Sequence, residues 1–486
     1  VGAGVDLGSS LGGGAAIDDG EEEEEPRDQG FARTRVLVLL PVRKAAAEWV
    51  QDLAALLPHG TKLKNEERFW AEYGAPESDD EGEEGEDGED GGAGEGPAKR
   101  RRGAAGDAIG ASADGKTRAR GKRSKGRKPE RDAEWRDLFG GNCDDCFTLG
   151  ISFAKKHAKL YSDFYQSDLI LASPLGLRLA AGAPGERKRD FDFLSSVEVL
   201  VLDQADAMVM QNWDVVEDVV ALINRMPAKP RETDFSRVRL QDLNGWAAHA
   251  RQTVVFCNHA LAEPLAFFRS CSNYAGRVLV HPEPQGSIRG VLRSSVPQLF
   301  RRVSAASLQA QDDARLAYFL RHLFPALTGT ALSVPEHIQL AGTVSSAEEG
   351  SGSLAGVAGS AGAGVASDQA QGRTIVYVPS YFDFVRLRNA LAKEADDVFS
   401  TLSEYASQSD VTRTRHMFVQ GHIPLLLVTE RFHFFRRYTL RGSQHVVFYG
   451  LPRLPSAYPH FVNALEQKHG EASCTVLFTR YEAEEL

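Results

Sequence analysis

The residues of this chain best suited to catalysis follow a short apolar run at residues 197–202. The run leads into the quartet Asp203, Gln204, Ala205 and Asp206. In nucleotide-hydrolysing α/β domains the first acid of such a quartet holds magnesium, and a following glutamate polarises the attacking water. Gln204 stands where that glutamate would be, and a neutral amide does not take up a proton. The quartet therefore predicts a degenerate acidic box with no catalytic residue, although an aspartate at a strand end is also an ordinary turn former.

Two further pairs of polar residues follow apolar runs. Arg43 and Lys44 come shortly after the run at residues 36–40, and Ser173 and Arg178 follow another short run. Ligands of α/β domains bind beyond the carboxyl ends of the strands, so these four residues are candidates for contacts to RNA phosphates. Solvated charges beside a helix start would give the same pattern, and that alternative stays open.

The segment at residues 431–441 mixes arginines with aromatic residues. Such a mixture can stack on bases and bind phosphates, or it can dock a protein through aromatic and arginine anchors. We favour a docking surface over a nucleotide site, and a buried helix face with charged flanks is the alternative. The candidates for docking or RNA binding are Arg431, Phe434, Phe435, Arg436, Arg437 and Arg441.

The spacing of cysteine and histidine gives little sign of a metal site. Cys143 and Cys146 form one C-x-x-C pair with no second pair nearby, whereas structural zinc usually needs four ligands. His259, His433 and His460 do not form a convincing set either. Five cysteines, an odd number in a long chain, do not suggest a disulfide scaffold and fit a reducing compartment. We expect neither a bound metal nor a cofactor.

The net charge of −11 averages over blocks of opposite sign. Acidic residues crowd positions 21–25 and 77–90, and basic residues crowd positions 99–102 and 116–131. Blocks of like charge stay solvated, so we expect a disordered insertion. Such a pair of blocks is common in nuclear and nucleolar proteins, and the basic part can serve as a localisation signal or bind RNA phosphates. A solvated insertion without a partner is the alternative.

Length and hydropathy limit the class of protein. At 486 residues the chain has room for two or three domains. It holds no run of about 18 uncharged apolar residues, so we expect no membrane span. Because it begins at Val1 and not at a methionine, we expect a fragment of a longer protein.

Apolar runs alternate with helical periodicity along the chain, which is typical of α/β domains with right-handed crossovers. Helices are expected near residues 45–57, 214–226 and 381–393. Strands are expected at residues 36–40, 169–173, 197–202, 253–257, 374–378, 425–428, 445–449 and 474–478.

These elements group into two similar α/β lobes, each with an insertion of biased composition. The expected parts are residues 1–30, a disordered Gly-rich and acidic start; 31–282, the first lobe, with a disordered insertion at 73–132; 283–312, a linker; and 313–486, the second lobe, with a flexible Gly-, Ala- and Ser-rich loop at 342–371.

Several elements resemble, in order and spacing, the motif series of the DEAD-box helicases. The resemblance implies two RecA-like parallel-sheet lobes as in those helicases. The matching elements are residues 41–44 (PVRK), 173–176 (SPLG), 203–206 (DQAD), 252–259 (QTVVFCNH), 377–380 (YVPS) and 418–429 (FVQGHIPLLLVT).

The departures from that series concern the residues that would hydrolyse ATP. Cys257, Asn258 and His259 replace the hydroxyl pair that couples the lobes. Glu430 replaces an aspartate, and residues 458–461 (YPHF) stand where an arginine finger would stabilise the transition state. A phosphate-cradling G-x-x-x-x-G-K-[ST] loop is also not found. We therefore expect no ATP hydrolysis, with an active ATP-dependent RNA helicase as the alternative.

Longer blocks resemble one family in particular, the digestive organ expansion factor family, also called U-three small nucleolar RNA-associated protein 25. The resemblance covers about residues 29–72 and 133–480. The blocks are residues 139–145 (FGGNCDD), 159–165 (KLYSDFY), 188–195 (KRDFDFLS), 203–207 (DQADA), 234–239 (DFSRVR), 273–277 (NYAGR) and 429–438 (TERFHFFRRY).

The family resemblance implies a nucleolar component of the small-subunit processome that is needed for 18S rRNA maturation. It implies preribosomal RNA, the U-three small nucleolar ribonucleoprotein and other processome proteins as partners, and no membrane. A helicase-like protein without catalysis in another nuclear complex is a further alternative.

Overall fold

The computed structural model describes most of both expected lobes. The glycine-rich start at residues 1–26, the charged insertion from residue 75 to 132 and the loop at 342–371 lie outside the described residues. The described residues are 27–74, 133–186, 189–229, 231, 233–280, 291–292, 295–330, 332, 372–466 and 472–482.

Within these residues the first part of the chain forms a seven-stranded sheet with the order β2-β4-β3-β5-β1-β6-β7. The strands β5, β1, β6 and β7 run parallel to one another, whereas β3 is antiparallel to both β5 and β4. The strands are β1 (Val36–Leu39), β2 (Lys62–Lys64), β3 (Thr148–Ala154), β4 (His157–Leu160), β5 (Leu169–Ala172), β6 (Val199–Leu202) and β7 (Gln252–Val255).

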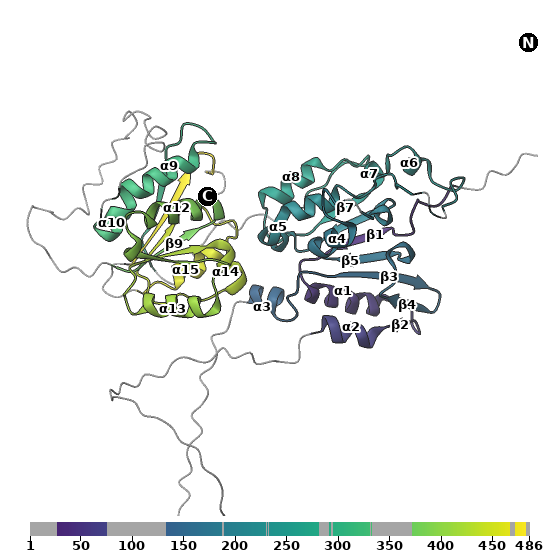
Figure 1. Cartoon of the computed structure of the whole chain (residues 1–486), viewed down its shortest axis with the longest axis horizontal. Coiled ribbons are helices and arrows are strands. Elements are labelled where there is room, and N and C mark those ends of the chain that lie inside the picture. The colour runs from purple at the N-terminus through teal and green to yellow at the C-terminus, as the bar shows by residue number, and fades with distance from the viewer. Residues whose placement is uncertain are drawn as a thin grey trace, which may run out of the picture.

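Both faces of this sheet are covered by helices, which explains why its central strands are continuous apolar runs. One buried cluster packs α1 and α2 against one face, and a second packs α4, α5 and α8 against the other (Figure 1). The helices are α1 (Arg43–Leu56), α2 (Glu66–Tyr73), α3 (Ala133–Phe139), α4 (Pro174–Ala181), α5 (Ala205–Val220), α6 (Leu240–Leu243), α7 (Ala247–Ala250) and α8 (Ala262–Ser270), with short turns η1 (Phe164–Gln166) and η2 (Asp192–Leu194).

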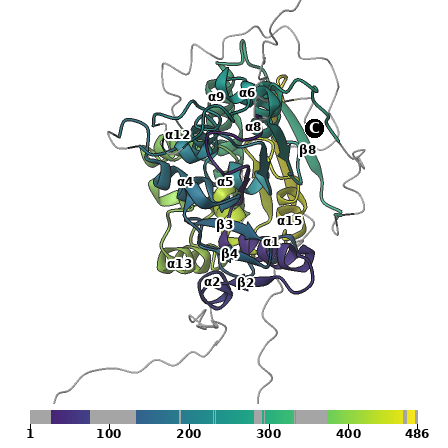
Figure 2. The same ribbon diagram turned by 90° about the vertical axis from the view of Figure 1, so that its right-hand side faces the viewer.

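The second part of the chain forms a six-stranded sheet, among the described residues, with the order β10-β11-β9-β12-β13-β8. All of its neighbouring strands are parallel. The strand β8 forms one edge and runs along the outside of the lobe (Figure 2). The strands are β8 (Gln298–Val303), β9 (Thr374–Val378), β10 (Phe399–Leu402), β11 (Leu425–Thr429), β12 (His445–Phe448) and β13 (Ser473–Thr479).

Helices also cover both faces of the second sheet. The side chains of α9, α10 and α12 form one cluster, and those of α13, α14 and α15 form the other. The helices are α9 (Gln311–Tyr318), η4 (Phe319–Leu323), α10 (Phe324–Thr328), α12 (Tyr381–Ala392), η6 (Asp396–Val398), α13 (Gln408–Val419), α14 (Glu430–Arg436) and α15 (Ala457–Asn463).

The α/β class and each expected strand are confirmed, but two boundaries differ from the prediction. The strand β8 lies inside the expected linker at 283–312 and belongs to the second sheet. The helix expected at 214–226 begins earlier, at Ala205, and is kinked at Asn212, whose φ is −165°. Both differences arise where the apolar pattern is interrupted by polar residues.

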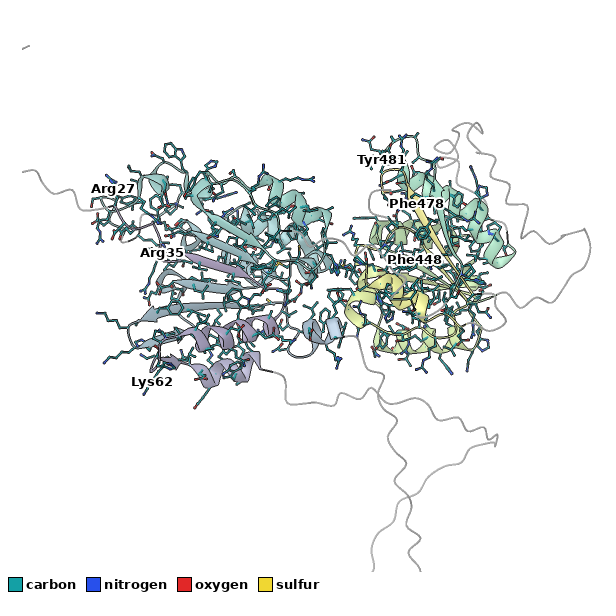
Figure 3. The ribbon with its side chains drawn as sticks, turned by 180° about the vertical axis from the view of Figure 1, so that it is seen from behind. Arg27, Arg35, Lys62, Phe448, Phe478 and Tyr481 are labelled. Carbon is teal, nitrogen blue, oxygen red and sulfur yellow. The ribbon has the colours of Figure 1, made fainter. Side chains whose placement is uncertain are left out.

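The two lobes lie side by side, with α3 between them (Figure 1). Arg35, which precedes β1, lies on the side of the first lobe away from the second (Figure 3). The parallel strands of the first sheet therefore direct their carboxyl ends toward the second lobe, so the residues that follow them lie close to the junction.

Candidate functional site at the junction of the lobes

The acidic box after β6 is held by α1 and by its own backbone. The carboxylate of Asp203 accepts a hydrogen bond from the indole Nε1 of Trp49 at 2.9 Å. Gln204 adopts a left-handed conformation, with φ 56° and ψ 48°, and is the residue before the first turn of α5. The first acid of the box therefore orients a helix of its own lobe.

Asp206 lies in the first turn of α5 and is buried, with 7% of its surface exposed. Burial raises the pKa of its carboxyl group, because the charged form loses solvation. Among the described residues no group of three histidine, cysteine, aspartate or glutamate side chains could hold a metal ion. Of the two acids of the box, Asp206 is thus the desolvated one, whereas Asp203 is half-buried.

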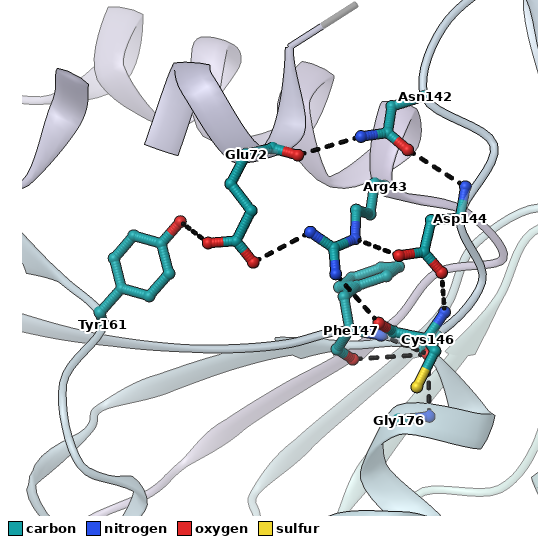
Figure 4. Close-up of polar contacts among 9 residues, drawn as sticks. Arg43, Glu72, Asn142, Asp144, Cys146, Phe147, Tyr161 and Gly176 are labelled. Carbon is teal, nitrogen blue, oxygen red and sulfur yellow. Dashed lines mark hydrogen bonds and ion pairs between the residues drawn. The ribbon is translucent and has the colours of Figure 1, made fainter. Parts of the chain in front are cut away.

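Arg43 begins α1 and is enclosed by groups of its own lobe (Figure 4). Its Nη1 lies 2.9 Å from Glu72 Oε1 and its Nε lies 2.9 Å from Asp144 Oδ2. Its Nη2 donates to the carbonyl oxygen of Cys146 at 3.2 Å. Glu72 is fixed in turn by the hydroxyl group of Tyr161, which donates to Oε2 at 2.9 Å. Two carboxylates therefore lie beside the charge of this candidate for RNA contacts.

The amino-terminal amides of α1 are also occupied. The backbone N–H of Arg43 donates to Asp144 O, and that of Lys44 donates to Asn142 O, both at 2.9 Å. Free amides at a helix start are a ready site for phosphate, but here the block FGGNCDD covers them. The ammonium group of Lys44 lies 3.2 Å from Glu48 and also donates to the carbonyl oxygen of Asp137.

The remaining RNA candidates likewise have partners within the first lobe. Ser173 is 1% exposed and caps α4, where its hydroxyl group accepts from Gly176 N at 3.0 Å. The same hydroxyl accepts from Phe147 N at 3.2 Å. Arg178 lies 3.4 Å from Asp218 of α5. RNA binding by these residues stays a prediction, and the structure gives each of them a structural role.

A polar cavity of about 240 Å³ lies beside the guanidinium group of Arg43. At α4 the cavity is lined by Gly176. A Cβ at this position would lie 2.3 Å from Phe147 O, so the close packing of α4 on Phe147 requires a glycine here. The residues around the cavity are Arg43, Glu72, Tyr73, Cys146, Phe147, Thr148 and Gly176.

A second arginine, Arg437, joins the two lobes. It follows α14 and its Nη2 lies 2.7 Å from Glu134 Oε2 of α3. Only 4% of the Arg437 side chain is exposed, whereas 40% of the Glu134 side chain is. The other guanidinium nitrogen, Nη1, lies 3.3 Å from His433 Nε2. Burial lowers the pKa of His433 well below its usual value, so its neutral ring can accept that hydrogen bond.

Aromatic rings reinforce this contact. The ring of Phe139 in α3 packs edge-on against Phe434 and Phe435, with centroids 5.4 Å and 5.8 Å apart. The indole Nε1 of Trp135 donates to the carbonyl oxygen of Phe435 at 3.1 Å. Phe434 is 8% exposed and belongs to the buried cluster of the first lobe, although the chain reaches it in the second.

Further polar contacts surround the aromatic centre. Arg431 donates to the carbonyl oxygen of Gln211 at 2.6 Å, and Arg453 lies 3.0 Å from Glu263. His259 lies 3.6 Å from Glu134. The neighbouring imidazole of His259 and the charge of Arg437 lower the pKa of Glu134 to about 2, so this carboxyl group is ionised at neutral pH.

The candidates in the segment at 431–441 therefore divide into two groups. Arg431, Phe434, Phe435 and Arg437 contact the first lobe. Arg441 is exposed, and Arg436 is half-buried and lies 3.5 Å from Gln408. The burial of Phe434 and Arg437 matches the buried-face alternative, whereas docking of an external partner stays a prediction.

Glu430 is a site residue whose role the sequence did not reveal. It begins α14, is 1% exposed, and accepts the backbone N–H groups of Arg453 at 2.8 Å and Leu454 at 3.2 Å. Burial raises its pKa to about 7. The side chain thus ties the end of β11 to the loop after β12, from which Arg453 reaches the first lobe.

Two family models match the chain. One, "UTP25, NTP hydrolase-like domain", matches residues 14–91 and 114–278, and the other, "Utp25, C-terminal domain", matches residues 363–486. No helix of the described residues is long and apolar enough to cross a membrane.

Curated relatives agree with the family models. The U3 small nucleolar RNA-associated protein 25 homolog of Xenopus tropicalis is 36% identical over 96% of this chain and 51% of its own. Protein NUCLEOLAR FACTOR 1 of Arabidopsis thaliana is 35% identical over 94% of this chain and 52% of its own. The chain spans about half the length of the curated relatives it matches.

Solved structures give a weaker likeness. A DEAD box protein from Methanococcus jannaschii is 12% identical, with a TM-score of 0.25 over 95% of this chain and 77% of that chain. The assignment therefore rests on the family models and the curated relatives. The chain belongs to the U3 small nucleolar RNA-associated protein 25 family.

Proposed function

We propose that this chain belongs to a non-catalytic, helicase-like assembly factor of the small-subunit processome, required for 18S rRNA processing and small ribosomal subunit biogenesis. In this role it works in the nucleolus and binds preribosomal RNA, the U3 small nucleolar ribonucleoprotein and other processome proteins. The names of its relatives, which refer to U3 small nucleolar RNA and to a nucleolar factor, support this proposal.

One observation carries the non-catalytic part of the proposal. The carboxylate of Asp203, where a nucleotide hydrolase would bind magnesium, is hydrogen-bonded to Trp49 at 2.9 Å. The neighbouring position holds Gln204, whose amide cannot act as a base. An active ATP-dependent helicase would require a glutamate at the position of Gln204 to polarise the attacking water.

We expect exposed cations to contribute more to RNA binding than the paired residues at the strand ends. Arg43 is paired with two carboxylates, and Arg178 is paired with one. Exposed cations outside these pairs, such as Arg441, and the basic stretch at residues 99–131 are the better candidates. Such binding is mainly electrostatic, so deletion of residues 99–131 should flatten its salt dependence.

A pair of substitutions tests the absence of catalysis. Asp203→Ala removes both the carboxylate and its hydrogen bond, whereas Trp49→Phe removes the same hydrogen bond and keeps the carboxylate. Each variant is expressed in cells from which the endogenous protein has been depleted. We expect both variants to restore mature 18S rRNA to the same level. The purified protein should show no RNA-stimulated ATP hydrolysis.

Failure of Asp203→Ala alone would contradict the proposal, since Trp49→Phe controls for packing. ATP turnover that disappears in Asp203→Ala would also show that the box is catalytic. Loss of 18S rRNA maturation on depletion, measured without any variant, tests the assembly role separately.

A further inference from the structure

We infer that α3 staples the two lobes into one fixed arrangement without nucleotide or RNA. The staple consists of Glu134, Trp135 and Phe139 of α3, which bind α14 and the residue after it. This inference goes beyond the proposed function, because it concerns how the lobes are held and not what they assemble with.

The position of α3 shows that it serves the junction more than its own lobe. None of its residues is buried, and it lies between the lobes (Figure 1). Its Phe139 ring nevertheless contacts two rings of α14, and its Trp135 donates to the backbone there. Phe139 also packs against the buried cluster of the first lobe, so the aromatic side chains of α3 contact both lobes.

The apolar core continues through the junction. Phe434 and Leu454 belong to one buried cluster with Met208, Trp213 and Leu261 of the first lobe. Both second-lobe residues are well buried, at 8% and 3% exposed. Aromatic side chains account for much of the energy of protein interfaces, so this contact resembles a core more than a transient touch between lobes.

The polar groups of the junction select one arrangement. Glu134 is bound by Arg437 from the second lobe and by His259 from the loop after β7. Because Arg437 is buried, a shifted packing of the lobes that kept Arg437 buried but removed Glu134 would leave an unpaired desolvated charge, which is strongly unfavourable. The aromatic contacts supply the strength of the staple, and the charges fix its geometry.

The residues concerned occupy the positions at which the chain departs from the DEAD-box series. His259 and residues 432–437 replace motif residues that would serve nucleotide and lobe coupling. A fixed junction presents one composite surface across both lobes, so a partner that spans them incurs no closure cost on binding. At these positions the chain therefore carries residues that hold the two lobes in one rigid arrangement.

Distances between spin labels on the whole chain test the staple. Spin-labelled amino acids are introduced genetically at Leu56 and Phe382, which are 82% and 81% exposed and lie in different lobes. This route avoids the exposed thiols of Cys143, Cys146 and Cys257. We expect a single narrow distance distribution that is unchanged by an ATP analogue with magnesium and oligouridylate.

Variants of α3 should broaden that distribution. Trp135→Ala with Phe139→Ala should raise the fraction of molecules with separated lobes, by roughly thirtyfold for each aromatic ring removed. Glu134→Gln keeps the shape of the side chain and should give a smaller rise. Glu72→Gln is the matched control, because it removes an arginine–glutamate pair inside the first lobe. It should leave the distance distribution unchanged.

Three outcomes overturn the inference. The wild-type chain could show a broad distribution, or the ligands could narrow it, in which case closure depends on ligand. The α3 variants could also stay narrow, in which case α3 is not the staple. Circular dichroism establishes that each variant is folded, and Glu134→Gln decides the matter if the double variant is not.

Discussion

Two arginine–glutamate pairs differ in which parts of the chain they hold together. The glutamate of one pair precedes residues 75–132, and the glutamate of the other follows them. Arg43 pairs with Glu72 at 2.9 Å just before that stretch, and Arg437 pairs with Glu134 at 2.7 Å just after it. The first pair lies within one lobe, whereas the second crosses between lobes. The same chemistry therefore serves local packing at one place and long-range arrangement at the other.

The surroundings of the two arginines differ as well. The Arg43 side chain is 16% exposed and has a second carboxylate, Asp144, within 2.9 Å. The Arg437 side chain is 4% exposed, and its Nη1 lies 3.3 Å from the neutral ring of His433. Because the Arg437 guanidinium is more deeply buried and Arg43 keeps Asp144 nearby, loss of the glutamate should matter less at Arg43 than at Arg437.

Phe434→Ala should have the largest effect. Removing a buried phenylalanine costs about 3 kcal/mol or more of the free energy of unfolding. Phe69→Ala, at a position that is 0% exposed in α2 near Arg43, should cost a similar amount. Only Phe434→Ala should also separate the lobes. Spin-label distances measure this separation, and urea denaturation measures the free energy of unfolding. Equal lobe distances in both variants would show that Phe434 acts only within the second lobe.

Removal of one carboxylate from each pair should give a smaller and unequal effect. Glu134→Gln should lower the free energy of unfolding by about 2 kcal/mol, because it separates a buried guanidinium from its ion pair. Glu72→Gln should cost about 0.5 kcal/mol, since Arg43 is more exposed than Arg437 and keeps Asp144. Thermal or urea denaturation at neutral pH measures both. A larger loss for Glu72→Gln would reverse the comparison.

The pH dependence of stability separates two glutamates of the junction. Burial raises the pKa of Glu430 from 4.5 to about 7, so the folded chain binds this proton more tightly than the unfolded chain. Stability from this group is therefore highest below pH 4.5 and falls as the pH rises through 7. For Glu134 the pKa falls to about 2, so its contribution is present above pH 4.5 and is lost toward pH 2.

Glu430→Gln should remove about 1 kcal/mol of the decline between pH 5 and 7.5, measured by denaturant unfolding. Asp383, whose pKa burial raises to about 6, titrates in the same window and must be compared through Asp383→Asn. A decline that is unchanged in Glu430→Gln would assign it to Asp383 or to other groups. The low-pH loss should persist in Glu430→Gln, because it belongs to Glu134.

Much of the fold follows from the sequence, because buried parallel strands leave continuous apolar runs. The strands β1, β5 and β6 were expected on that ground and lie next to one another in the sheet. The strands β2 and β10 were not expected, since each lies at an edge, is short, and carries polar or charged residues. Edge strands bury one side less, so the apolar signal is weak.

The sequence predicted some residues of the site but not the contacts that they make. Strand ends indicated Asp203 and Arg43, and the mixture of arginines with aromatic residues indicated Arg437, but neither pattern indicated their partners. Trp49 lies 154 residues from Asp203 in the chain, and Glu134 lies 303 from Arg437. Spacing carries no information over such separations, because contacts of that kind are set by the packing of whole lobes.

The smallest effect on stability is expected at the two arginines that lie away from the staple. Arg441 is exposed and Arg436 has only a long contact, 3.5 Å, to Gln408. Arg436→Ala with Arg441→Ala should therefore change the free energy of unfolding by no more than about 0.5 kcal/mol and leave the lobe distances unchanged. If these arginines contact RNA phosphates, the slope of log affinity against log salt should fall by about 2, measured with oligouridylate. Arg413→Ala, at an exposed arginine that is paired with Asp410 at 3.1 Å, is the matched control and should alter the slope less. An unchanged slope together with normal entry into preribosomal particles would leave the segment after β11 with a purely internal role, and RNA or partner binding would have to be sought on other surfaces.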